Sequence, residues 1–434
     1  MNRFLLAAAL AALPACPAAA QLSSPEQRIA ATVEAERGRN EALLQRLGDQ
    51  NSGSLNVAGV TKVGDMMRAE LAPLGFDVKW IDMRETGRAG HIVATHRGKA
   101  GTTRMLLIGH LDTVFEPSSA FQKYQRTGDK AVGPGVQDDK GGMVVIVAAL
   151  RAMQAAGTLK DANIEVVLTG DEERTGAPIG VARRDLVAAG KRADVSLEFE
   201  GLVRDEQGRD FGTVARRGSI GWTVSVTGKP GHSSGVFGPQ LGYGAAYELA
   251  RILDGFRREL AEQNLTYNVG VMAAGTPATL ADNAYQVSAE GKTNMVAGSA
   301  VARGDLRALT AEQAARAQAK MQAIVAKHLP GTGATISFEE GYPPMAPTPG
   351  NRALLGKLNG VNRDLELREM TEWDPAKRGA ADSSWVAADT DVLAGLGPYG
   401  EGAHAEGESV DLTSIPLQAK RAAILMTRLS SEKR

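Results

Sequence analysis

The sequence predicts a layered α/β domain that is interrupted by a smaller α+β unit, and three observations lead to this fold class. Apolar strand-like runs alternate with helical runs up to residue 212, which is the order expected of helices packed on a sheet. Near residue 213 the pattern changes to an alternation of apolar and polar residues, typical of an exposed antiparallel strand. A Pro/Gly-rich connector, GYPPMAPTPG at 341–350, then leads back to the first domain.

The helices and strands of the first domain are expected in a regular order. Residues 25–50 and 57–76 are rich in helix formers, and the second helix should end near Pro73 and Gly75. GGMVVIVAALRAMQAAG at 141–157 is apolar nearly all round, which indicates a buried helix. The expected strands are FDVKWID (76–82), HIVATHRG (91–98), RMLLIGHLD (104–112), NIEVVLTGDEE (163–173) and ADVSLEFEG (193–201).

The interrupting unit is expected to be α+β and ferredoxin-like. Its strand-like stretches are GTVARRGSIGWTVSVTGKPG from residue 212 and the runs at 267–274, 284–291, 300–308 and 334–340, with helices at 241–264 and 311–328. We therefore predict that this unit spans 213–340 and that the α/β domain spans 21–212 and 341–434.

The first twenty residues, MNRFLLAAALAALPACPAAA, have the layout of a secretory signal peptide: a basic residue, an apolar stretch and small residues. We expect cleavage near Ala20 and a periplasmic or secreted protein. The apolar stretch is short for spanning a membrane, and no later stretch is long and apolar enough to do so. A lipoprotein anchored at Cys16 is the alternative, which the two prolines flanking this cysteine disfavour.

The composition limits the function classes. Hydrophobic residues make up 43% and charged residues 23% of the chain, as in an ordinary soluble globular protein. The formal net charge is −1 and no basic cluster is present, which argues against a nucleic-acid partner. Cys16 is the only cysteine, so after cleavage any metal ligands must be His, Asp or Glu.

The first candidate site residues follow a predicted strand. In LLIGHLDTVF (106–115), His110 and Asp112 stand two apart behind an apolar run, so strand alternation puts them on one side. A metal-ligating imidazole usually donates its other N–H to a carboxylate, which Asp112 could supply. By itself the pair is a weak signal, because a core strand can simply end in this way.

GPGVQDDKGG (133–142) places Asp138 and Asp139 in a glycine-rich turn before the buried helix. Two adjacent carboxylates at the edge of an apolar core need compensation, either by a divalent metal or by exposure to water. A helix N-terminus also favours anions. The turn alone leaves both readings open.

Two more strands end in acidic residues. LTGDEERTG carries Asp171, Glu172 and Glu173, and SLEFEG carries Glu198 and Glu200. The alternative for each is a solvated turn. However, ligands gather at the carboxyl ends of strands in α/β sheets, so the recurrence of His and acidic residues at successive strand or turn ends is more informative than any one of them.

A fifth segment, GEGAHAEGESVD, places His404 in a polar, glycine-rich loop. The ordered set GHLDTV, GPGVQDDKGG, TGDEE, SLEFE and AHAEGE resembles the zinc-dependent aminoacylase and carboxypeptidase superfamily, and most resembles the bacterial glutamate carboxypeptidases that cleave folates. The resemblance covers nearly the whole mature chain. It implies a zinc-peptidase catalytic domain with an inserted lid and dimerisation domain, and a homodimer formed through that inserted domain.

The resemblance implies two zinc ions per subunit, bridged by Asp138 and by a water or hydroxide. His110 and Glu200 would bind one ion, and Glu173 and His404 would bind the other. Co²⁺ or Mn²⁺ would also suit these imidazole and carboxylate ligands.

The remaining roles also come from the resemblance. Glu172 would be the general base that takes a proton from the shared water and passes it to the leaving amine, while Asp112 would orient the neighbouring histidine. His232 would reach the active site of the partner subunit and stabilise the oxyanion. Arg307 would hold the free carboxylate of the substrate, and Asn294 would contribute from the lid.

Three segments depart from the family pattern: Gly201 and Ala297 stand where proline is common, and RGAADSSW (378–385) replaces a glycine-rich turn that often ends in Thr-Asp. These departures leave the metal ligands intact and affect substrate choice and lid geometry.

The function that follows is a metallohydrolase releasing a C-terminal amino acid, with glutamate release from a folate-like or N-acylated substrate as the leading hypothesis. An N-acyl-amino-acid amidohydrolase or dipeptidase with the same site is the close alternative. A non-catalytic zinc-binding or dimerisation module is the alternative of another class. The intact ligand set together with Glu172 argues against that module, because a binding module needs no base.

Overall fold

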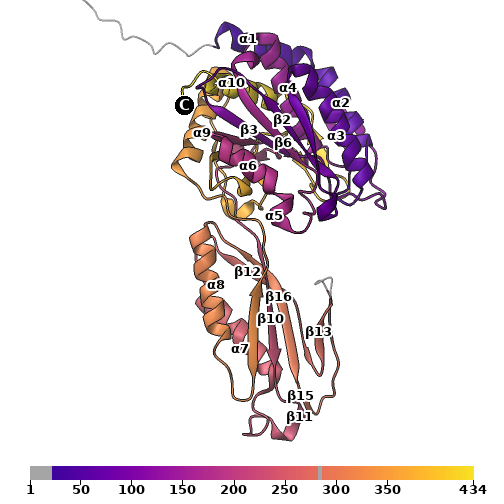
Figure 1. Ribbon diagram of the computed structural model, residues 1–434, viewed down its shortest axis with the longest axis vertical. Helices are drawn as coiled ribbons and strands as arrows, with labels where there is room; N and C mark the ends of the chain where they lie inside the picture. Colours follow the sequence, from indigo (N-terminus) through magenta and orange to yellow (C-terminus); the bar gives the residue numbers. More distant parts are fainter. Residues whose placement is uncertain (1–21, 282–285) are drawn as a thin grey trace, which may run out of the picture.

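The computed structural model describes residues 22–281 and 286–434, which form an upper and a lower lobe in Figure 1. The predicted signal peptide at 1–20, with Ala20 and Cys16, lies outside the described residues, as does the start of the strand expected at 284–291. In the part of the chain that is described, no helix has both the length and the hydropathy needed to cross a bilayer.

The upper lobe is built on a six-stranded sheet in the order β1-β2-β6-β3-β7-β19. Its strands are β1 (Asp77–Asp82), β2 (Gly90–His96), β6 (Asn163–Thr169), β3 (Arg104–His110), β7 (Val195–Glu198) and β19 (Asp391–Leu393). The strands from β6 to β19 run parallel, whereas β2 is antiparallel to both of its neighbours. The carboxyl ends of β6, β3 and β7 therefore meet at one edge of the sheet.

Helices cover both faces of this sheet (Figure 1). On one side α4 (Lys140–Ala156) packs against α1 (Ser24–Ala35) and α10 (Ser414–Leu429), and α6 (Arg184–Arg192) lies on the other. Burial on both faces explains the apolar run inside β3: Leu107 packs in the core that holds α4, while its neighbour Ile108 packs in the core that holds α6. The other upper-lobe helices are α2 (Arg37–Asp49), α3 (Val57–Leu71), α5 (Ile179–Ala182) and α9 (Pro349–Asp364).

Two small sheets complete the upper lobe. One has the order β18-β9-β8 and the other the order β20-β21-β5-β4. Their strands are β18 (Thr371–Glu372), β9 (Asp210–Gly212), β8 (Val203–Arg204), β20 (Gly400–Glu401), β21 (Ser409–Asp411), β5 (Lys130–Val132) and β4 (Gln125–Thr127).

The lower lobe has a four-stranded antiparallel sheet in the order β12-β16-β10-β17, with two helices packed on one face. Trp222 in β10 is fully buried and meets Phe256 edge-on, with ring centroids 5.7 Å apart. The elements are β10 (Ile220–Thr227), β12 (Thr266–Gly275), β16 (Ser299–Arg307), β17 (Gly333–Phe338), α7 (Gly244–Glu259), α8 (Ala311–Val325), and the short pairs β11 (Gly231–His232) with β15 (Met295–Val296) and β13 (Ala278–Leu280) with β14 (Val287–Ala289).

This architecture confirms the expected fold class, an α/β domain with an inserted α+β unit. Three expected helices differ in detail. The segment 25–50 forms two helices that meet at Glu36, and the helix from Val57 ends at Leu71 and continues as a 3-10 turn that contains Pro73. The helix expected from residue 241 begins only at Gly244, because Gly242 and Gly244 adopt left-handed backbone angles, with φ of 68° and 74°.

Candidate active site

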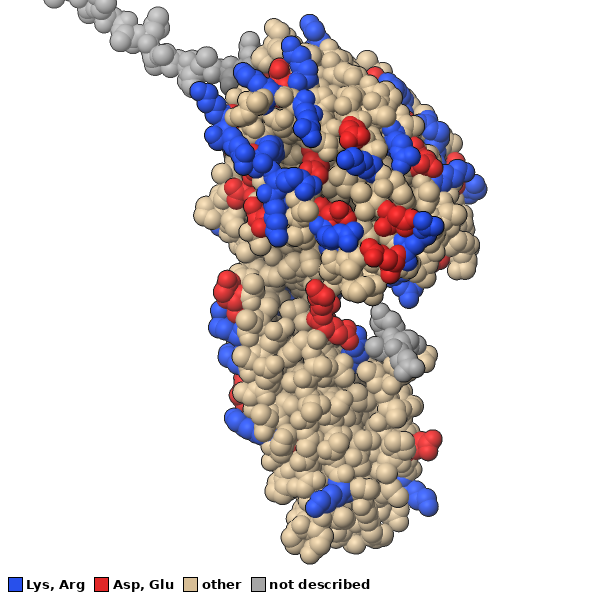
Figure 2. Space-filling model, viewed as in Figure 1, with Lys and Arg blue, Asp and Glu red and all other residues tan. Residues whose placement is uncertain are grey.

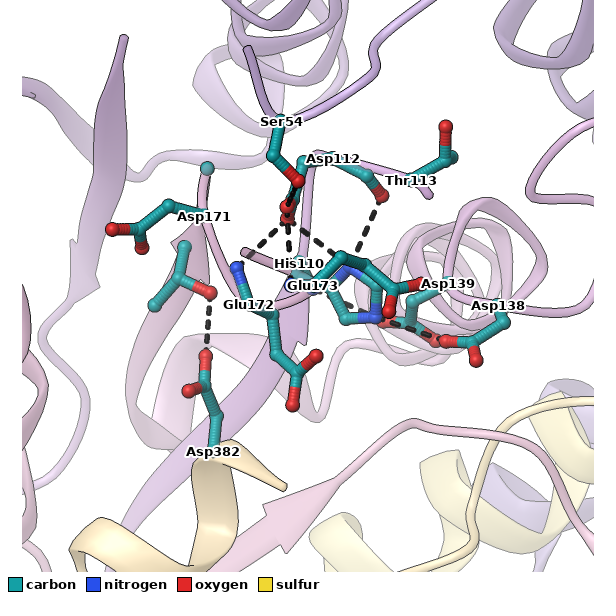
Figure 3. Close-up of polar contacts among 12 residues, drawn as sticks. Ser54, His110, Asp112, Thr113, Asp138, Asp139, Asp171, Glu172, Glu173 and Asp382 are labelled. Atoms are coloured by element: carbon teal, nitrogen blue, oxygen red, sulfur yellow. Dashed lines mark hydrogen bonds and ion pairs between the residues drawn. The ribbon is translucent and has the colours of Figure 1, made fainter. Parts of the chain in front are cut away.

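Polar side chains from three strand ends meet at one edge of the six-stranded sheet, and Figure 3 shows those at the ends of β3 and β6. His110 is the last residue of β3, Glu172 and Glu173 follow β6, and Glu200 follows β7. Asp138 stands in the turn just before α4, and its peptide bond to the next residue is cis. The parallel order of β6, β3 and β7 is what places side chains from distant parts of the chain together.

Asp138 lies between two imidazoles. Its Oδ1 is 3.0 Å from His110 Nε2, and its Oδ2 is 3.2 Å from His404 Nε2. His404 Nε2 is also 2.9 Å from Glu173 Oε2. Each oxygen of the Asp138 carboxylate thus faces a different histidine, which is the arrangement needed for a bridging ligand.

The surrounding carboxylates shift the pKa values of this cluster. Hydrogen bonds to Asp138 and Glu173 raise the pKa of His404 to about 11, and burial raises the pKa of Glu173 to about 7. Burial opposes the charge on His110, but the adjacent Asp112 and Asp138 outweigh it and hold the pKa of His110 well above its usual value. Without a bound cation, the cluster therefore holds protons near neutral pH.

Asp112 is fully buried and connects His110 to the turn after β6 (Figure 3). Its Oδ1 is 3.4 Å from His110 Nδ1 and accepts the backbone N–H of Glu172 at 3.0 Å. Its Oδ2 accepts the Ser54 hydroxyl at 2.6 Å and the backbone N–H of Glu173 at 3.1 Å. The backbone carbonyl of Asp112 lies 3.1 Å from the same imidazole nitrogen. One carboxylate thus fixes a histidine and two consecutive glutamates.

The Glu172 carboxylate differs from its neighbours, because among the described residues it has no hydrogen-bond or ion-pair partner. Burial, together with nearby carboxylates including Glu200, raises the pKa of Glu172 well above its usual value. Its backbone is firmly held, since its N–H reaches Asp112 and its carbonyl accepts the Tyr342 hydroxyl at 3.1 Å. A side chain with this pKa on a fixed backbone suits a proton acceptor.

Two arginines adjoin Glu200. Arg216 is buried, and its Nη2 donates to Glu198 Oε2 at 2.6 Å and to Glu200 Oε2 at 2.5 Å. Arg378 Nη2 lies 3.6 Å from the same Glu200 oxygen and donates to the Gly201 carbonyl at 2.8 Å. Burial and the adjacent Arg216 lower the pKa of Arg378 to about 10. Both positive charges lie on the Glu200 side of the cluster.

Glu408 is buried behind the turn that carries Asp138. Its carboxylate accepts three backbone N–H groups of that turn, from Gly135 at 3.0 Å, Gln137 at 2.8 Å and Asp138 at 3.0 Å. Because Glu408 and His404 belong to one loop, this contact also ties the histidine to the turn.

The donor set fits a divalent metal. The ligand atoms of His110, Asp138 and Glu173 lie within 4.8 Å of one another, and so do those of His110, Glu172 and Glu200. Imidazole nitrogen and carboxylate oxygen are donors that suit zinc and related ions. A cation would also relieve the repulsion between closely spaced carboxylates.

Three predicted site residues lie outside this cluster, in the lower lobe. His232 is exposed at the far end of that lobe, with its Nδ1 2.8 Å from the Ser234 hydroxyl (Figure 1). Asn294 adjoins the same loop, since its carbonyl accepts the N–H of Ser233 at 2.9 Å. Arg307 ends β16 beside the junction of the lobes and pairs with Asp305 at 2.7 Å.

Four residues around the cluster were not expected from the sequence: Arg216, Arg378, Glu408 and Tyr342. Only Glu408 had a local signal, because it lies in the same acidic loop as His404. The others come from segments whose proximity depends on the tertiary fold.

Comparison with known proteins identifies the family. The model of Peptidase family M20/M25/M40 matches residues 106–428, which include all the residues of the cluster. The chain belongs to this family. It is therefore a hydrolase of the metallopeptidase class, and the cluster is its candidate metal-dependent active site. The M20 match also confirms the resemblance drawn from the sequence.

Two relatives show the range of activities among similar proteins. Carboxypeptidase G2 of Pseudomonas sp. (strain RS-16) is 27% identical over 400 residues, which cover 90% of this chain and 89% of the relative. A succinyl-diaminopimelate desuccinylase of Sphingopyxis alaskensis is 33% identical over 202 residues, covering 44% of this chain and 50% of the relative.

Solved structures share the fold at low identity. Aminopeptidase PepT of Bacillus cereus superposes with a TM-score of 0.70 at 17% identity, covering 91% of this chain and 99% of that one. The M20 family metallo-carboxypeptidase Sso-CP2 of Sulfolobus solfataricus gives 0.62 at 15%, covering 90% and 99%. YXEP of Bacillus subtilis, described as a dinuclear metal-binding M20 peptidase, gives 0.61 at 13%, covering 92% and 99%.

Proposed function

We propose that this M20 enzyme is a di-zinc carboxypeptidase that releases a C-terminal amino acid from a peptide, an N-acyl amino acid or a folate-like substrate. The observation that carries the proposal is the unpartnered Glu172 carboxylate beside a cluster of metal-type ligands. The similarity to carboxypeptidase G2, 27% identical over 90% of this chain, supports the carboxypeptidase activity.

In this proposal His110 and Glu200 hold one zinc ion, Glu173 and His404 hold the other, and Asp138 bridges them. Bound zinc would supply Lewis-acid activation of a water and of the scissile carbonyl. Co²⁺ or Mn²⁺ would fit the same donors.

The proton transfers fall to Glu172. Its carboxylate takes a proton from the attacking water and delivers it to the amine that leaves when the C–N bond breaks. The raised pKa of Glu172 favours its uptake of the proton from the water. Asp112 fixes the positions of the His110 ring and of the Glu172 backbone.

We also propose that residues 213–340 act as a lid and dimerisation domain, and that 21–212 and 341–434 form the catalytic domain. On the face in Figure 2 charged side chains cover the upper lobe densely but leave much of the lower lobe free. Val269 and Met272 on the edge strand β12 are 38% and 62% exposed. A homodimer through this lobe would cover them and bring His232 to the oxyanion of a partner subunit.

Arg307 and Asn294 are the proposed substrate-binding residues of this lobe. We further propose export to the periplasm or medium after cleavage near Ala20. N-terminal sequencing of the exported protein checks this cleavage, and a lipid on Cys16 would contradict it.

A substrate panel with metal analysis of the same sample tests the activity. N-acyl amino acids, dipeptides and folates should separate the carboxypeptidase from an aminoacylase or dipeptidase. Glu172→Ala should abolish turnover while zinc content stays at wild-type level. Unchanged turnover would defeat the mechanism, and a protein that binds zinc but hydrolyses none of the panel would favour the non-catalytic module.

Sedimentation tests the dimer. If the fully active enzyme sediments only as a monomer, His232 cannot act across an interface.

A further inference from the structure

The guanidinium of Arg378 lies at the rim of the metal-ligand cluster. Its side chain is 17% exposed, close to the 16% of Glu200 and the 18% of Asp138. Arg378 Nη2 is 3.6 Å from Glu200 Oε2, which is too long for a hydrogen bond. Among the described residues, Arg378 therefore forms an ion pair with Glu200 but no hydrogen bond with any of the proposed ligands.

Glu200 does not need Arg378 as its counter-ion, because Arg216 already fills that role. The Arg216 guanidinium makes charged hydrogen bonds to both Glu198 and Glu200 and donates from Nη1 to the Gly379 carbonyl at 3.0 Å. It is almost fully buried, at 2% exposure. Arg216 thus reads as the structural arginine of the pair.

Arg378 makes fewer hydrogen bonds than Arg216. Within the described residues its only hydrogen bond is the one from Nη2 to the Gly201 carbonyl, whereas Arg216 makes three. The Nε of each arginine is buried without an acceptor among these residues, but Arg378 also leaves its Nη1 without one. Buried donors of a charged group rarely stay unpaired in proteins, because an unmade charged hydrogen bond is costly. The unused donors call for an anionic acceptor.

We infer that Arg378 binds a carboxylate of the substrate next to the metal cluster. The inference rests on the proposed carboxypeptidase function, which it deepens by naming an anionic substrate class. A planar carboxylate matches the fork of guanidinium donors, and such charged pairs are among the stronger hydrogen bonds. Arg307 in the lower lobe would take a second carboxylate, so the two arginines together select a released residue with two negative groups.

The carboxylate on Arg378 comes either from the side chain or from the α-carboxyl of the released residue. Three matched substrates separate these sources. N-acetylglutamate carries both groups, N-acetylglutamine lacks the side-chain carboxylate, and N-acetylglutamate α-amide lacks the other. The variant is Arg378→Met, and the matched control is Lys377→Met, since Lys377 is exposed and lies over the Trp373 ring, 5.4 Å from its centroid.

Arg378→Met should lower kcat/KM for N-acetylglutamate by about 10- to 100-fold, as expected for one charged hydrogen-bonded contact. For the amide substrate that already lacks the carboxylate bound by Arg378, kcat/KM should change less than about 3-fold. Zinc content should match wild type, and Lys377→Met should behave as wild type. An equal fall for all three substrates, or a loss of zinc, would overturn the inference and make Arg378 a structural partner of Glu200.

Binding gives a readout that does not depend on turnover. Calorimetry on the zinc-loaded protein should show glutarate binding that Arg378→Met weakens by a similar factor, with glutaramate binding weakly to both. Equal glutarate affinities would overturn the inference. Arg378→Lys keeps the positive charge but loses the paired guanidinium donors, so it should bind glutarate with an intermediate affinity. This variant tests the inference if Arg378→Met does not fold. If the wild-type enzyme hydrolyses none of the panel, the proposed function fails. The glutarate measurements would still test whether Arg378 binds a carboxylate.

Discussion

The hydroxyl of Tyr342 donates to the backbone carbonyl of Glu172 across 3.1 Å. The same hydroxyl accepts a hydrogen bond from Arg183 Nη2 at 2.8 Å. Burial raises the pKa of Tyr342 well above its usual value, so the phenol stays protonated and can donate. Tyr342 also pairs with Ser219 in the connection between the lobes. The segment that leaves the lower lobe therefore holds the backbone of Glu172, the proposed base, in place.

Replacing Tyr342 with Phe should lower kcat by about 10-fold with little change in KM, because the change loosens Glu172 without touching substrate. The free energy of unfolding should fall by about 1–3 kcal/mol, since a buried Arg183 donor loses its acceptor. Steady-state kinetics and denaturant unfolding measure both. Tyr247→Phe is the control, because Tyr247 is 53% exposed and its hydroxyl has no hydrogen bond within the described residues. Wild-type kcat in Tyr342→Phe would rule out the support.

Glu408→Ala should weaken the metal site without removing a ligand. It leaves three backbone N–H groups of the Asp138 turn without their acceptor, which should cost about 2–4 kcal/mol of stability and lower zinc affinity. Thermal unfolding and competition with a chelator measure these effects. Glu406→Ala in the same loop is the matched control, because Glu406 is exposed, and it should match wild type. Equal zinc affinity in both variants would contradict the role of Glu408.

The ordered motifs predicted much of this molecule from the sequence alone. Residues such as His110 and Glu173 were recognisable because each ends or follows an apolar run, and strand ends collect at one edge of a parallel sheet. The fold class followed from the order of strands and helices and is confirmed. These signals are local, so they can be read along the chain.

Supporting residues were not predictable in the same way. Arg216 and Glu200 are 16 positions apart and belong to segments with different patterns, so nothing local shows that they form an ion pair. Arg378 and Tyr342 contact the site only after the chain has passed through the lower lobe and returned. The start of the helix expected from residue 241 was also predicted wrongly, because the left-handed backbone at Gly244 delays it.

His110→Ala and Asp112→Ala should have different effects. The first removes an imidazole nitrogen and should cost one zinc ion per subunit. The second keeps every ligand but removes the acceptor for Ser54, Glu172 and Glu173, so zinc affinity or turnover should fall by about 10- to 100-fold with both ions still loaded at high metal concentration. Metal analysis together with kinetics separates the two. A full zinc complement in His110→Ala would remove His110 from the ligand set.

Zinc binding should release protons, because the metal-free cluster holds protons that the metal must displace. The pKa of His404 is raised to about 11, so this imidazole is protonated in the metal-free enzyme at every pH below that value. The pKa of Glu173 is raised to about 7, so this carboxylate is half protonated at neutral pH and fully ionised only above it.

Because zinc must displace these protons, zinc affinity should rise with pH, about tenfold per pH unit for each proton displaced. The pKa of His110 is also raised well above its usual value, so calorimetric zinc titrations in two buffers of different ionisation enthalpy should count about two to three released protons near pH 7. His404→Ala should release about one fewer. Zinc affinity that does not change between pH 6 and pH 8 would show that these groups are not the ligands.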